Sequence, residues 1–236
     1  KRIIVARLFA AVLYRIYDVL GMAGCYILVA VLRGGTHTAV YLLAVKLTKG
    51  NYLFSTSSCL LAFLPGSMFL CARPFTASVL LLVLTVCILE QYTSGKKRVL
   101  LLLPLVSIAL INIHASMWPM MFVLMLPYLV ESLPLPNLGF LIFQKRNQVP
   151  LFGGQWLFGG FGFLNPYGLE NMLYLTYSYG DSEVNSKISE MQPVTIISLP
   201  GIMAFSLFLI GIWSLVRLQK VYVRYAALFL GTALLA

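Results

Sequence analysis

Charged residues are scarce in this chain, at 10% of 236 residues, whereas a soluble domain typically contains about 25%. Acidic residues are the rarest, with seven Asp and Glu against 17 Lys and Arg, and the resulting net charge is +10. The basic residues fall mostly in short clusters between apolar runs, as they do in the cytoplasmic loops of membrane proteins. This distribution excludes a soluble domain and argues against nucleic acid as a partner.

Metal-binding and disulfide patterns are also missing. The cysteines lie within or at the ends of apolar runs, without the spacing of a zinc site or a disulfide framework: Cys25, Cys59, Cys71 and Cys87. We interpret them as small buried apolar residues. His114 has no Cys, Asp or Glu near it in the sequence, so we propose no metal site there and expect no cofactor.

Long apolar runs are what the sequence does contain. Hydrophobic residues make up 60% of the chain, and runs such as Val99–Ile111 and Val194–Val216 carry neither charge nor a polar helical face. They predict an all-α fold, a polytopic transmembrane helical bundle of about eight elements, as a single domain over residues 1–236. The candidate spans are Met22–Val45, Tyr52–Leu70, Thr76–Gln91, Val99–Ile113, Met117–Val130, Leu151–Leu164, Val194–Val216 and Tyr222–Ala236.

The segment Ile3–Leu20 has a different pattern. Its apolar residues share one helical face, and Arg7, Arg15 and Asp18 fall on another. Charge interrupts the segment too often for a span, so we predict an amphipathic helix at the membrane interface. Within the first span, Arg33 should face protein or water, either as an ordinary buried partner or in a functional role.

The basic clusters predict the orientation of the bundle. They follow alternate spans, at Lys46 and Lys49, Lys96 to Arg98, Lys145 and Arg146, and Arg217 and Lys220. The positive-inside rule places these ends in the cytoplasm. Segments 73–74, 112–116 and 165–192 then lie on the external side, together with Ile3–Leu20. The four basic residues at this end of the chain run against the rule: Lys1, Arg2, Arg7 and Arg15. Either the topology fails there or the segment meets an anionic partner.

Unusual polar residues gather in these external segments. Arg73 is either an arginine reaching the lipid headgroups or a phosphate clamp. Asn112 and His114 are either a polar helix end or ligands for sugar hydroxyls or phosphate. The run from Asn165 to Gly168, which includes Tyr167, is by itself a helix-stop turn. Four of the acids follow in a segment that is either a solvated loop or part of a site: Glu170, Asp181, Glu183 and Glu190.

Taken in order, these motifs resemble those of bacterial polytopic membrane proteins of the GT-C-like glycosyltransferase superfamily. That pattern runs R-P-Q, W-x-N-x-H-G, L-x-N-P-Y-G and E-W-x-P, and this chain has Arg73-Pro74, Asn112-x-His114, Leu164-Asn165-Pro166-Tyr167-Gly168 and Glu190-x-x-Pro193. The chain departs from it at several positions: Phe75 replaces Gln, Leu110 and Ile111 the aromatic residue, Ala115 the Gly, and Met191 the Trp. The family's acidic first external loop has no counterpart here, and we expect further residues of the full protein on both sides of the sequence.

The resemblance implies transfer of a sugar from a polyprenyl-phosphate-linked donor, on the external face of the bacterial inner membrane. Arg73, with Arg7 or Arg15, would stabilise the phosphate, and Asn112, His114, Asn165 and Tyr167 would order the site. Glu190 would position the acceptor or serve as an auxiliary base. Membrane lipid is the surrounding partner, and the sugar and the acceptor stay open. The alternatives are a non-enzymatic membrane protein, such as a lipid-linked glycan transporter or scaffold, and an inactive relative.

Overall fold

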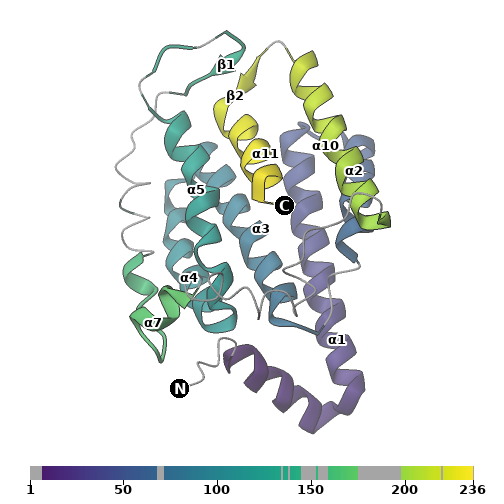
Figure 1. Ribbon diagram of the computed structural model, residues 1–236, viewed down its shortest axis with the longest axis vertical. Helices are drawn as coiled ribbons and strands as arrows, with labels where there is room; N and C mark the ends of the chain where they lie inside the picture. The colour runs from purple at the N-terminus through teal and green to yellow at the C-terminus, as the bar shows by residue number, and fades with distance from the viewer. Residues whose placement is uncertain are drawn as a thin grey trace. The chain divides into compact units, whose positions relative to one another are not determined.

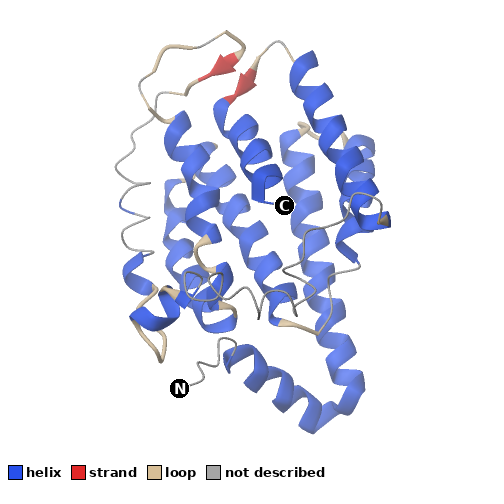
Figure 2. Ribbon diagram, viewed as in Figure 1, coloured by secondary structure: helices blue, strands red, loops and turns tan. Residues whose placement is uncertain are grey.

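The computed structural model describes residues 7–67, 72–133, 135–137, 139–144, 153, 159–174, 198–218 and 220–235. These residues are predominantly helical (Figure 2), which confirms the prediction of an all-α fold. The chain falls into two compact units. Unit 1 comprises Lys1–Met121 and Leu157–Leu175, and unit 2 comprises Phe122–Trp156 and Thr176–Ala236.

Unit 1 is built from helices that alternate in direction. They are α1 (Arg7–Leu47), α2 (Tyr52–Ser67), α3 (Pro74–Thr93), the 3₁₀ helix η1 (Lys97–Leu102), α4 (Leu103–Ile113), the 3₁₀ helix η2 (Ala115–Met117) and the short α7 (Leu169–Met172). Lys46 Nζ donates to the Glu90 carbonyl at 2.6 Å, which joins the C-terminal ends of α1 and α3. His114 at the end of α4 lies 3.1 Å from Ser78 near the start of α3. Hence α1 and α3 are parallel, and α4 runs against them.

Helix α1 bends sharply at Gly21, whose φ of 59° and ψ of −152° are not helical. Figure 1 shows the purple first segment turned away from the rest of α1. Glycine suits the bend because residues with a Cβ rarely adopt this backbone conformation. The bend falls between the predicted interfacial segment Ile3–Leu20 and the predicted span Met22–Val45. Residues 3–6 lie outside the described residues, and the interfacial position stays a prediction.

The core of unit 1 lies between α3 and α4. Leu89 of α3 and Leu103, Leu110 and Ile111 of α4 are fully buried. Trp118 is also buried. Its Nε1 donates to Ser107 Oγ of α4 at 2.8 Å, so the indole nitrogen has a hydrogen-bond partner. The core therefore ties the end of α4 to the chain that follows η2.

Unit 2 consists of most of α5 (Met120–Glu131), together with α10 (Leu199–Arg217) and α11 (Val223–Leu235). Two short strands, β1 (Leu141–Ile142) and β2 (Val221–Tyr222), pair in parallel, with Leu141 opposite Val221. Helices α10 and α11 pack through stacked Phe208 and Phe229, whose ring centroids are 5.6 Å apart. Ser198 caps α10 by accepting from the Gly201 amide at 3.2 Å.

Two described helices, α1 and α3, are long and apolar enough to cross a membrane. Other predicted spans form shorter helices. The segment Val99–Ile113 divides into η1 and α4 because Pro104 suits only the first turn of an α-helix. Half of the predicted span Leu151–Leu164 lies outside the described residues. The structure thus bears out the helical segments, and a bundle of about eight membrane elements remains a proposal.

Candidate ligand-binding end of unit 1

Arg73 stands at the start of α3, where it is the N-cap residue in an extended conformation. Pro74 occupies the first turn, as the sequence predicts, where its missing amide hydrogen removes no helical hydrogen bond. The side chain of Arg73 is exposed, and the Thr76 amide donates to its carbonyl at 3.1 Å. The backbone of Arg73 thus begins α3, and its side chain lies at the surface at this end of the helix.

His114 ends α4 with an extended backbone, at φ −156° and ψ 83°. Its Nδ1 lies 3.1 Å from Ser78 Oγ, and Ser78 is fully buried on α3. Burial lowers the pKa of His114 from its usual 6.5 to about 4. The imidazole is therefore neutral at pH 7, so it binds a ligand by hydrogen bonding and not by charge.

Asn112 joins the end of α4 to the segment that precedes α7. Its Nδ2 donates to the Ile108 carbonyl at 2.8 Å, and to the Leu164 carbonyl, 52 positions away in sequence, at 2.9 Å. Both amide hydrogens are therefore engaged by the backbone. The buried Asn171 of α7 adds a second link, from Nδ2 to the Ile111 carbonyl at 3.2 Å.

Asn165 organises the turn before α7. Its Nδ2 donates to the carbonyls of Gly162 and Gly168 at 2.6 and 3.1 Å, and its Oδ1 accepts from the Tyr167 amide at 2.9 Å. Gly168 has a φ of 53°, which a residue with a Cβ rarely adopts. The predicted turn is therefore present and is closed by the Asn165 side chain. The turn also positions Tyr167, which is half-buried.

These contacts bring three of the four sequence motifs to one end of unit 1. Arg73 begins α3, His114 contacts the first turns of α3, and Asn112 ties Asn165's segment to α4. In Figure 1 the first segment of α1, which carries the exposed Arg15, lies at this same end. The side chain of Arg7 and the whole of Glu190 lie outside the described residues. That these residues form one binding site stays a prediction.

The opposite end of unit 1 is basic. Lys46 bonds to Glu90 near the end of α3, and the Lys96 amide donates to the Gln91 carbonyl. Arg73 stands at the other end of α3, a helix of 20 residues whose length is about 30 Å at 1.5 Å per residue. This length matches the hydrocarbon thickness of a bilayer, about 30 Å. Lys145, the third basic position in the predicted topology, lies outside the described residues.

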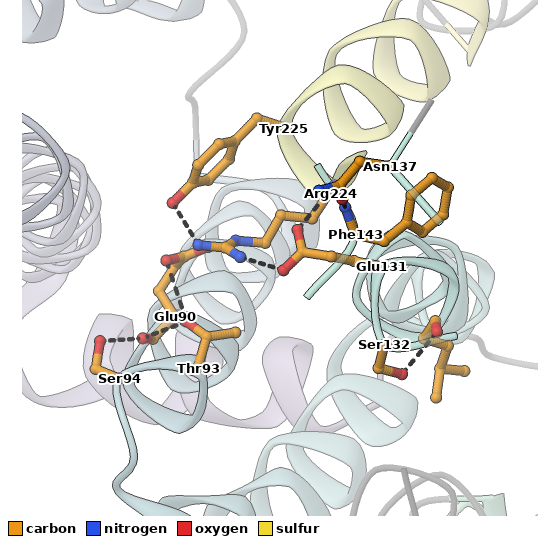
Figure 3. Close-up of polar contacts among 10 residues, drawn as sticks. Glu90, Thr93, Ser94, Glu131, Ser132, Asn137, Phe143, Arg224 and Tyr225 are labelled. Atoms are coloured by element: carbon orange, nitrogen blue, oxygen red, sulfur yellow. Dashed lines mark hydrogen bonds and ion pairs between the residues drawn. The ribbon is translucent and has the colours of Figure 1, made fainter. Parts of the chain in front are cut away.

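Unit 2 contains a charged cluster that the sequence analysis did not identify. Arg224 donates through its backbone amide to Glu131 Oε2 at 3.1 Å, and its guanidinium forms a short ion pair with Oε1. Figure 3 shows Arg224 reaching between the Tyr225 hydroxyl, its partner at 2.9 Å, and Glu131. The guanidinium carbon also lies 4.7 and 4.4 Å from the ring centroids of Tyr222 and Tyr225. The cluster thereby fastens the end of α5 to the start of α11.

One signal could have pointed to this cluster. Arg224 is a lone cation inside the apolar run 221–236, and an ionisable residue in such a run requires a partner. Its partner lies 93 positions away, so spacing could not identify Glu131. Among the described residues, no group of three or more His, Cys, Asp or Glu is placed to hold a metal ion.

Comparisons of the chain with protein-family models, with curated proteins and with solved structures gave no match.

Proposed function

We propose that this protein is a multi-pass membrane protein of the bacterial inner membrane, and that the Arg73–His114 end of unit 1 binds the headgroup of a polyprenyl-phosphate-linked sugar. The observation that carries the proposal is the gathering of Arg73, His114 and the Asn165 turn, which are far apart in sequence, at one helical end. Basic side chains lie at the other end, as the positive-inside rule requires of a cytoplasmic side.

The side chains at the Arg73–His114 end of unit 1 suit such a headgroup. Arg73 provides a planar guanidinium that binds phosphate oxygens through two parallel hydrogen bonds. Asn112 and Asn165 have their amide hydrogens engaged by backbone carbonyls, so they position the loops. The apolar helices behind this end would accommodate the lipid tail, whose burial contributes about 0.8 kcal/mol per methylene group.

The reaction that we propose is transfer of the sugar by direct displacement. A carboxylate takes the proton from the acceptor hydroxyl, whose oxygen forms a new bond to the anomeric carbon. The bond from that carbon to the phosphate oxygen breaks, and the lipid phosphate leaves with the electron pair. Arg73 stabilises the charge that develops on the phosphate, and Glu190 is our candidate for the auxiliary base.

The binding step is tested with purified protein in lipid nanodiscs and farnesyl phosphate as the probe. Arg73→Gln should weaken binding by about 10- to 100-fold, because a charge-assisted hydrogen bond contributes about 1.5–3 kcal/mol. The affinity of Arg73→Lys should fall between those of the unchanged protein and Arg73→Gln, since lysine keeps the charge but lacks the planar guanidinium. The control is Arg98→Gln, an exposed arginine at the opposite end of unit 1. Equal losses in Arg73→Gln and Arg98→Gln would refute a specific phosphate site.

A non-enzymatic role in binding or moving a lipid-linked glycan is the second candidate. One observation favours it: no described carboxylate hydrogen-bonds to His114, whose hydrogen-bond partner is Ser78. Incubation with a radiolabelled polyprenyl-phosphate sugar distinguishes the two functions. Release of free polyprenyl phosphate, lost in Glu190→Gln, supports the enzyme, whereas binding without release supports the carrier.

A further inference from the structure

The contacts of Ser78 determine where the proton of His114 lies. Ser78 Oγ is 2.9 Å from the Pro74 carbonyl oxygen and 3.1 Å from His114 Nδ1. A serine hydroxyl has one hydrogen to donate. The carbonyl of Pro74 can only accept, so the Ser78 hydrogen must point to it. Nδ1 must then carry a hydrogen and donate it to Ser78 Oγ.

The reverse assignment fails on the same geometry. If Ser78 donated to Nδ1, its oxygen lone pairs would face the Pro74 oxygen at 2.9 Å with no hydrogen between them. Ser78 is fully buried, so water could not relieve that contact. An unsatisfied buried polar contact of this kind costs about 1–3 kcal/mol. The arrangement with the proton on Nδ1 satisfies the Ser78 hydroxyl, the Pro74 carbonyl and Nδ1 together.

The second ring nitrogen is then an acceptor. Burial holds the pKa of His114 at about 4, so the ring carries a single N–H at pH 7 and its Nε2 has a lone pair. No described residue hydrogen-bonds to Nε2. His114 therefore presents a hydrogen-bond acceptor, whereas Arg73 at the same end of unit 1 presents only donors.

We infer that Ser78 is a positioning residue that fixes the Nδ1–H tautomer of His114, so that Nε2 accepts a hydrogen bond from a hydroxyl group of the ligand. This inference rests on the proposed function for the ligand's identity and deepens it. A phosphate diester or ionised monoester has oxygens that accept, so it cannot be the group that His114 binds. Arg73 takes the phosphate and His114 takes a sugar hydroxyl, which divides the headgroup between two side chains.

The tautomer is measured directly by nitrogen-15 NMR of histidine-labelled protein in nanodiscs at pH 7. The chain has two histidines, and His37→Asn leaves the His114 signals alone in the spectrum. The expected result is a protonated Nδ1 and an unprotonated Nε2. Ser78→Thr should keep this pattern, and Ser78→Ala should lose it. A proton on Nε2 in the otherwise unchanged protein would overturn the inference.

A matched control separates this effect from general damage to α3. Thr85 is also fully buried on α3, and its hydroxyl donates to the Leu81 carbonyl at 2.9 Å, four residues back. Thr85→Val removes a comparable back-bonded hydroxyl far from His114. It should leave the His114 tautomer unchanged. A tautomer change in Thr85→Val equal to that in Ser78→Ala would contradict a specific role for Ser78.

The ligand assignment is tested with farnesyl phosphate, which has a phosphate and no sugar hydroxyl. His114→Asn keeps a donor near the Nδ1 position and removes the Nε2 acceptor. It should bind farnesyl phosphate within about twofold of the unchanged protein, while Arg73→Gln weakens binding at least tenfold. Equal losses in the two variants would overturn the assignment. Failure of the unchanged protein to bind farnesyl phosphate would instead refute the proposed function, and the NMR result would still decide the tautomer.

Discussion

The two units bury polar groups in opposite ways. In unit 2, Glu131 and Arg224 bind each other, and Tyr225 takes a further guanidinium hydrogen. In unit 1, the Ser78–His114 pair satisfies one ring nitrogen and leaves an acceptor on the other. The first cluster pairs two opposite charges inside unit 2. The second has hydrogen-bonding capacity for a group that the described chain does not supply.

This difference separates a structural contact from a candidate binding contact. A buried ion pair whose donors and acceptors match has little to offer a ligand, and breaking it leaves an uncompensated charge. A buried residue held on one side by the protein, with a defined atom facing outward, is prearranged for recognition. Changes in the Glu131–Arg224 cluster should therefore affect folding, and changes at His114 should affect both binding and the response to pH.

The largest effect is expected from Glu131→Leu. It removes the carboxylate that pairs with Arg224, which is 6% exposed, and should destabilise unit 2 by about 3–5 kcal/mol. Thermal unfolding in detergent, followed by near-UV circular dichroism, measures the loss. The double variant Glu131→Leu/Arg224→Met should recover most of it, because a well-packed apolar pair replaces a buried ion pair at little cost. A double variant as unstable as the single one would show that the pair does not act as a unit.

Next in size is the pH dependence from His114. The folded pKa of about 4 lies below the ordinary value of 6.5, so between these values the unfolded chain binds a proton that the folded chain does not. Stability should be constant above pH 7 and fall by about 3 kcal/mol as the pH drops from 6.5 to 4. Unfolding temperatures from pH 7 to pH 4 test this against His114→Asn. The variant should lose less stability over that range, and identical curves would contradict the expectation.

A smaller effect should follow Gly162→Ala, in the segment that Asn112 and Asn165 hold. An added Cβ would lie 2.5 Å from Trp118 Cζ2 and 3.1 Å from Met172 Cε. This overpacking should cost about 1–3 kcal/mol. Gly160→Ala is the matched control, because a Cβ there meets nothing within 4 Å. Equal unfolding temperatures for the two variants would show that the segment can move aside, and that this end of unit 1 is looser than described.

The smallest effect should come from Arg217→Ala. Arg217 lies over the exposed Trp213 ring, 5.6 Å from its centroid. An exposed cation–π contact contributes about 0.5–1 kcal/mol, well below the buried Arg224. The same thermal measurement compares Arg217 with the Arg224 cluster. A loss as large as that of Glu131→Leu would mean that burial does not explain the importance of the Arg224 cluster.

Much of the helical pattern was accessible from the sequence. The predicted spans Tyr52–Leu70, Thr76–Gln91 and Val194–Val216 correspond to α2 (Tyr52–Ser67), α3 (Pro74–Thr93) and α10 (Leu199–Arg217). Apolar runs bounded by Pro, Gly and basic residues predict helix limits well, because these residues act locally on the backbone. Whether each helix crosses the membrane depends on length, hydropathy and burial, and among the described helices α1 and α3 have the length and hydropathy of a span.

The site was harder to predict because its contacts join distant positions. Charge alternation placed Arg73 and His114 on one side, and both lie at the same end of unit 1. Spacing could not show that Asn112 and Asn165 use their amide hydrogens on backbone carbonyls, nor that Ser78 contacts His114, 36 positions away. Those contacts depend on helix packing, and through them the amide hydrogens of the two asparagines support the local backbone.

The bend at Gly21 makes the position of the first segment of α1 sensitive to the backbone angles of a single residue. The segment from Arg7 to Leu20 is about 21 Å long at 1.5 Å per residue, so a rotation of about 10° at Gly21 would move its far end by roughly 4 Å. Gly24 permits close packing across the bend, since a Cβ there would lie 2.7 Å from Ile16 Cγ2. The direction of the first segment of α1, and with it the position of Arg15, therefore depends on two glycines, one at the bend and one at the close contact that follows it.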